Sequence, residues 1–80
     1  MKYIIKDVNK IDVLNTEDVD EAYKYLKKHV NDSEHLLSID RIKNAINYDK
    51  NYAKKPQSCF GFYADKEQKE YISLEVFWDE

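Results

Sequence analysis

EYISLEVFW, residues 70–78, alternates apolar side chains with polar or aromatic ones at a period of two. A period of two is typical of a β-strand that has one face buried and the other exposed. The two faces carry Ile72, Leu74, Val76 and Trp78 on one side and Tyr71, Ser73, Glu75 and Phe77 on the other. This stretch therefore predicts a strand whose first set of side chains lies in the core.

A second strand precedes it. Residues 59–64 (CFGFYA) are separated from residues 70–78 by the polar segment 65–69 (DKEQK), which predicts a hairpin. Phe60 and Phe62 fall on the core face of the first arm. Gly61 falls on the opposite face, where its missing side chain leaves room for the ring of a neighbouring residue.

Residues 16–30 predict the clearest helix. Acidic residues stand near its start and basic residues near its end, which complements the helix dipole. Asn15 or Thr16 is expected to cap it, because both side chains accept hydrogen bonds from the free N–H groups of a first turn. One apolar stripe at helical spacing consists of Val19, Ala22, Tyr23, Leu26 and Val30.

A second helix follows, with Ile39, Ile42 and Ile46 at helical spacing. Its start is open at this stage. Asp32 or Ser33 gives an early cap, and Ser38 gives a late cap that leaves Leu36 and Leu37 as an apolar connection. The helix extends to about residue 48 or 52, and Pro56 ends it at the latest.

The chain begins with a further strand at residues 2–8 (KYIIKDV). Residues 11–14 either extend it or form a second strand after a turn at residues 9–10. Residues 1–80 are thus expected to form a single domain of the α+β class with the order β-α-α-β-β. In this small two-layer sandwich, both helices cover one face of a three- or four-stranded, mainly antiparallel sheet. The order of the strands stays open.

Composition excludes several classes of protein. The chain has 80 residues, a net charge of −3, one Cys and no apolar run near the ~18 residues that a membrane span needs. A single Cys cannot build a disulfide scaffold, and charge at residues 2 and 6–7 argues against a signal peptide, so we expect a cytoplasmic protein. Arg41 is the only arginine, which argues against nucleic acid as a partner.

No catalytic or cofactor-binding pattern is found. The run Asp32-Ser33-Glu34-His35 holds the residue types of a hydrolytic triad, but four consecutive residues point in different directions, so helix capping is the better interpretation. His29, His35 and Cys59 lack the spacing of metal ligands. One glycine cannot build a phosphate-binding loop. We therefore expect no enzyme activity, no cofactor and no metal.

The surplus of aromatic residues is the most informative feature. Seven Tyr, three Phe and one Trp exceed what so small a core can bury. An exposed sheet face rich in Tyr and Phe resembles the centre of a protein interface, although cross-strand aromatic pairing also stabilises a sheet by itself. Acidic residues beside this face would steer a basic partner. The expected partner-binding residues are Tyr63, Tyr71, Ser73, Glu75, Phe77, Asp79 and Glu80.

The sequence thus favours a small, non-catalytic protein-interaction module that binds another protein or a second copy of itself. Many small, single-domain proteins rich in Asn, Ile, Lys and Tyr belong to a phage or another mobile element, where they regulate or inhibit other proteins. Two alternatives stay open. One is a nucleic-acid-binding regulator that resembles a helix-turn-helix protein, with residues 37–46 as the reading helix. The other is an acidic mimic of DNA, for which a charge of −3 is weak.

Overall fold

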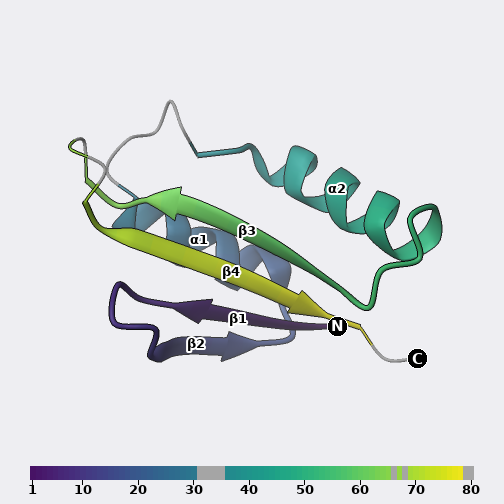
Figure 1. Cartoon of the computed structure of the whole chain (residues 1–80), viewed down its shortest axis with the longest axis horizontal. Coiled ribbons are helices and arrows are strands. Elements are labelled where there is room, and N and C mark those ends of the chain that lie inside the picture. Colours follow the sequence, from purple (N-terminus) through teal and green to yellow (C-terminus); the bar gives the residue numbers. More distant parts are fainter. Residues whose placement is uncertain (31–35, 66, 68, 79–80) are drawn as a thin grey trace.

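The computed structural model describes residues 1–30, 36–65, 67 and 69–78. Its elements are, in chain order, β1 (Lys2–Lys6), β2 (Asp12–Thr16), α1 (Val19–His29), α2 (Ile39–Asn51), β3 (Gln57–Tyr63) and β4 (Tyr71–Phe77). The four strands form one antiparallel sheet in the order β2-β1-β4-β3 (Figure 1). The predicted α+β class and element order are confirmed, and the open strand order is resolved with β1 beside β4.

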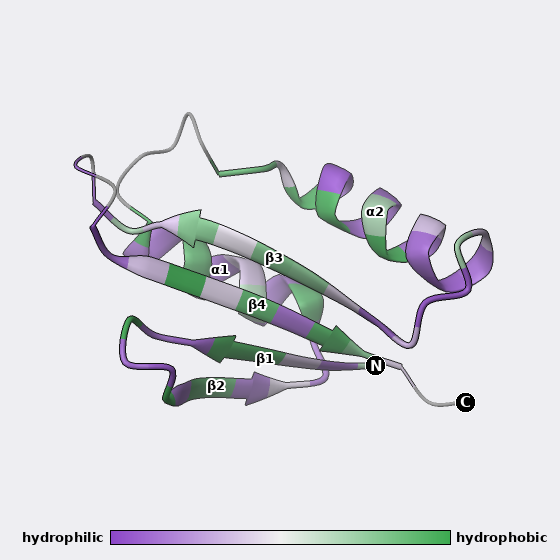
Figure 2. Cartoon of the chain, in the orientation of Figure 1, coloured by the Kyte–Doolittle hydropathy of each residue, from purple (hydrophilic) through white to green (hydrophobic). Residues whose placement is uncertain are grey.

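The two helices share one face of the sheet, which we call the inner face. In Figure 1, α1 lies behind the sheet and α2 runs alongside β3. Along the strands, hydrophobic and hydrophilic positions alternate (Figure 2), and the inward ones join both helices in a single apolar cluster. The buried members of this core are Tyr3, Ile5, Ala22, Leu26, Val30, Ile42, Ile46, Phe62, Ala64, Ile72, Leu74 and Val76.

The early hairpin answers one question that the sequence left open. Residues 12–16 form a separate strand, β2, because the chain reverses after Asp7. One Asp7 carboxylate oxygen accepts hydrogen bonds from the backbone N–H groups of Asn9 (2.9 Å) and Ile11 (3.1 Å). Lys10 completes the turn with a φ of 63°, in the left-handed region. The turn is therefore built from an aspartate and a strained lysine rather than from a glycine.

Replacing Lys10 by glycine should stabilise the protein. A left-handed conformation costs a residue other than glycine roughly 1–2 kcal/mol, of which the greater freedom of glycine in the unfolded chain cancels a part. We expect Lys10→Gly to raise the free energy of unfolding by about 0.5–1 kcal/mol in a urea titration. The matched control is Lys24→Gly within α1, which should lower it by about 1 kcal/mol. A loss of stability in Lys10→Gly would contradict the left-handed conformation of Lys10 in this turn.

The helix starts show one wrong prediction and one confirmed alternative. Helix α1 is capped by Asp18, whose carboxylate accepts from the N–H of Asp20 (2.9 Å), and not by Asn15 or Thr16. Thr16 pairs with Tyr3 in the sheet, and its hydroxyl accepts from the N–H of Asp18 (3.1 Å), one residue before the helix begins. Helix α2 starts late, with Ser38 as its cap, so the early start at residues 32–33, which lie outside the described residues, is wrong.

Polar contacts hold the connections against the core. The Tyr23 hydroxyl donates to the carbonyl oxygen of Leu37 (3.0 Å), which ties the segment before α2 to α1. The Ser58 hydroxyl, buried at the start of β3, donates to a carboxylate oxygen of Asp49 on α2 (2.6 Å). These bonds link α1 to the segment before α2, and α2 to β3.

Candidate interaction surface

The sheet face opposite the helices is the candidate interaction surface, and we call it the outer face. The strand register arranges its side chains in rows that cross the sheet, for example Asn15, Ile4, Glu75 and Cys59. Among the described residues, no helix packs on this face. It consists of Lys2, Ile4, Lys6, Asn15, Gln57, Cys59, Gly61, Tyr63, Tyr71, Ser73, Glu75 and Phe77.

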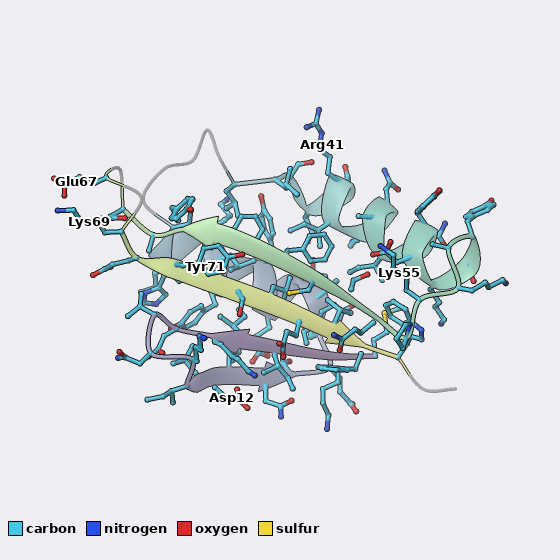
Figure 3. All side chains as sticks on the ribbon, in the orientation of Figure 1. Asp12, Arg41, Lys55, Glu67, Lys69 and Tyr71 are labelled. Atoms are coloured by element: carbon cyan, nitrogen blue, oxygen red, sulfur yellow. The ribbon has the colours of Figure 1, made fainter. Side chains whose placement is uncertain are left out.

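Tyr71 and Gly61 form the best-defined contact on the outer face. A Cβ atom added to Gly61 would overlap the hydroxyl oxygen and the ring of Tyr71, so the ring lies directly on the glycine backbone. Tyr63, paired with Tyr71 across the strands, meets this ring edge to face at a centroid distance of 5.6 Å. Figure 3 shows Tyr71 on the near side of the sheet. The predicted room at Gly61 for a neighbouring ring is confirmed.

The two tyrosines nevertheless remain open to solvent. Tyr71 is 50% exposed and Tyr63 is 41% exposed, while Ser73, Glu75 and Phe77 are half-buried. One face of each ring therefore stabilises the sheet and the rest is free for contact. The structure brings five of the seven predicted binding residues onto one surface. Asp79 and Glu80, the other two, lie outside the described residues.

The charge of the outer face differs from what the sequence suggested. Glu75 lies in the middle of the sheet, and its carboxylate is 3.5 Å from the ammonium group of Lys6. Sequence reasoning missed Lys6 because the pairing of β1 with β4 was unknown. The only signal was the alternation of Lys2, Ile4 and Lys6. Because Lys2 and Lys6 share the surface with Glu75, the described part of the outer face is not acidic.

A second surface gathers basic side chains around two clefts beside the C-terminal half of α2, and we call it the α2 surface. Two shallow clefts of about 310 and 400 Å³ meet there, with Lys50 and Asn51 lining both. Tyr48 and Tyr52, which are 61% and 72% exposed and stack at a centroid distance of 5.8 Å, line neither cleft. The helical repeat places them on the side of α2 away from Lys43 and Lys50. The lysines around the two clefts are Lys43, Lys50, Lys54 and Lys55.

The residues considered for catalysis or metal binding are dispersed. Cys59 is an exposed free thiol in β3, and the His29 ring stacks on Tyr25 at the end of α1 (4.1 Å between centroids). No three His, Cys, Asp or Glu side chains among the described residues come together as metal ligands. The run from Asp32 to His35 lies outside the described residues.

Among the described residues, neither helix is long and apolar enough to cross a membrane. Comparisons of the chain with protein-family models, with curated proteins and with solved structures found no match.

Proposed function

We propose that this protein is a non-catalytic interaction module that binds another protein through its outer face. One observation supports this most directly: Tyr63 and Tyr71 are about half exposed on a sheet face over which no described helix packs. Partly exposed aromatic rings on a flat, rigid surface are typical of interface centres, because they bury much area at a small entropic cost. Such a module would regulate or inhibit its partner by covering part of the partner's surface.

The charges of the outer face suggest the chemistry of the partner surface. Glu75 and Lys6 neutralise one another near the centre, and Lys2 stands at the rim. A largely apolar surface with a few hydrogen-bonding groups would complement this pattern better than a strongly basic one. The phage or mobile-element origin, and a role in the cytoplasm, remain part of this proposal and rest on composition.

Phe77→Ala should abolish capture of the partner. Phe77 is half-buried on the outer face of β4, so truncation removes contact area without opening the core. We expect the variant to lose at least about tenfold in affinity, as is usual for an aromatic anchor. The measurement is capture from host lysate with immobilised protein, followed by mass spectrometry.

The matched control is Tyr52→Ala, which removes an exposed aromatic ring from α2 instead. A partner lost by Phe77→Ala and retained by Tyr52→Ala supports the outer face. A partner retained by Phe77→Ala, in a variant with an unchanged circular dichroism spectrum, would overturn the proposal.

The lysines of the α2 surface favour a second candidate function, binding of nucleic acid. The lysines around the two clefts would contact phosphates there. In the same capture, nuclease-sensitive material that Lys50→Glu removes and Phe77→Ala retains would support this function. One observation weakens the other alternative, an acidic mimic of DNA. Several carboxylates already accept hydrogen bonds within the chain: those of Asp7, Asp18, Asp49 and Asp65.

A further inference from the structure

The two edges of the sheet differ in how they are protected. Edge strands expose unpaired backbone groups, and proteins commonly protect them with short strands, charges or bulges. Strand β2 has five residues, carries Asp12, and pairs with β1 through an irregular register near Lys6. Strand β3 has seven residues, QSCFGFY, in regular register and without a charge or a proline. Figure 2 shows β3 mostly in hydrophobic and neutral colours.

The alternation of backbone hydrogen bonds between β3 and β4 shows which N–H and C=O groups of β3 point away from β4. The N–H of Ala64 donates to the carbonyl oxygen of Glu70 (2.7 Å), directly across the hairpin. In an antiparallel pair, hydrogen-bonded and non-hydrogen-bonded residue pairs alternate. Tyr63, Gly61, Cys59 and Gln57 therefore direct their N–H and C=O groups away from β4. All four of these residues are exposed, and no described strand pairs with this edge.

We propose that β3 pairs antiparallel with β3 of a second copy and joins the two sheets into one of eight strands. This inference goes beyond the proposed function, because it concerns the edge of the sheet rather than its outer face, and it names the partner, a second copy of the chain. A two-fold axis makes such a contact self-complementary, so the same edge serves both copies. Full overlap of the seven residues places the axis at Phe60.

Phe60 supports this register. It lies on the inner face of β3 and is only half-buried, at the rim of the core. In the proposed pair it faces Phe60 of the second copy in a non-hydrogen-bonded position, where opposite side chains approach most closely. The dimer would therefore complete the burial of an aromatic ring that the single chain leaves partly open.

Charges at the two ends of β3 support the antiparallel direction. With Phe60 on the axis, Lys55 of one copy, whose ammonium group lies 3.5 Å from a carboxylate oxygen of Asp49 in its own chain, faces Asp65 of the other. The N–H groups of Glu70 and Lys69 hold the pKa of Asp65 below its usual range, so its carboxylate is charged at neutral pH. A parallel pair would instead bring Lys55 beside Lys55. Helix α2 packs on the inner face through Ile42 and Ile46, and Figure 1 shows it alongside β3.

The experiment compares one charge placed at each edge. Cys59 and Asn15 occupy the two ends of the same row on the outer face, so Cys59→Lys and Asn15→Lys add the same group in matched positions. By sedimentation velocity of the purified chain over a wide concentration range, we expect a dimer for the unmodified protein and for Asn15→Lys. Cys59→Lys should raise the dimer dissociation constant about tenfold or more, which is about 1.4 kcal/mol.

A zero-length carbodiimide cross-link tests the register. Lys55 and Asp65 lie at opposite ends of β3, about 30 Å apart along an extended strand, so a link between them must join two copies. Figure 3 shows Lys55 far from the loop that holds Glu67 and Lys69. We expect a Lys55–Asp65 peptide in the mass spectrum of the dimer and its loss in Cys59→Lys.

Three results would overturn the inference: a monomer at all concentrations, a dimer that Cys59→Lys leaves unchanged while circular dichroism shows a folded variant, or a dimer without the Lys55–Asp65 link. A monomer that still captures a partner through Phe77 would overturn this inference alone and leave the proposed function standing. A dimer that captures no other protein would overturn the proposed function and leave this inference standing.

Discussion

Leu26→Ala should lower the free energy of unfolding by about 3 kcal/mol, the largest effect that we expect of a single substitution here. Leu26 is completely buried, at the point where α1 packs on the sheet. The truncation removes apolar contacts and leaves a cavity that so small a core cannot easily close. Because 80 residues typically give about 4–12 kcal/mol of stability, this loss is a substantial fraction of the total.

A urea titration followed by Trp78 fluorescence and by helical circular dichroism measures this loss. Lys27→Ala is the matched control, since Lys27 is the next residue of α1 and is exposed. Its effect should stay within about 0.5 kcal/mol. A loss below about 1 kcal/mol in Leu26→Ala would show that α1 does not pack on the core as described.

The second large effect concerns Gly61, where the same substitution should change stability in opposite directions with and without the Tyr71 ring. In the unmodified protein, Gly61→Val should lower the free energy of unfolding by about 1 kcal/mol or more, because a side chain there must displace the Tyr71 ring. In a Tyr71→Ala background the same substitution should raise it by up to about 1 kcal/mol. A β-branched residue favours a strand, and in that background the space over Gly61 is vacant.

A double-mutant cycle over these four proteins measures the coupling between Gly61 and Tyr71, which we expect to be about 2 kcal/mol. Additive effects would show that the ring does not lie on the glycine in solution. Gly61→Val also shows what Tyr71 does in binding, because it moves the ring away and leaves the rest of the outer face intact. If partner capture survives Gly61→Val, the role of Tyr71 is to cover the glycine.

The local elements could be predicted because their signals lie within short windows of sequence. The alternation through Ile72, Leu74 and Val76 predicted β4 and its buried face. The spacing of Ile42 and Ile46 predicted the buried side of α2. The cap of α1 could not be predicted reliably, because residues 15–18 include three capping side chains, Asn15, Thr16 and Asp18. Strand pairing decided among them by drawing Thr16 into β2.

Only the part of the candidate site that lies on the β3–β4 hairpin could be predicted from the sequence. Tyr63, Tyr71 and Gly61 come together through one short loop, so their shared face follows from the period of two alone. Lys6 joins Glu75 only because β1 pairs with β4, and residues 2–6 are separated from residues 73–77 by both helices. Long-range pairing leaves no mark in a local pattern, so the electrostatic balance of the outer face required the structure.

The pairing of β1 with β4 also has a consequence for synthesis of the chain. The central ladder joins Lys2 to Phe77 and Lys6 to Ser73, so β1 can complete its pairing only after β4 has been made. On the ribosome, the β1–β2 hairpin and α1 can form early, but their sheet stays half complete until residues 73–77 emerge. Contacts between such distant segments slow folding, because a long loop must close before any of them form. During that interval one side of β1 is unpaired, and its backbone N–H and C=O groups are exposed to pairing with other strands.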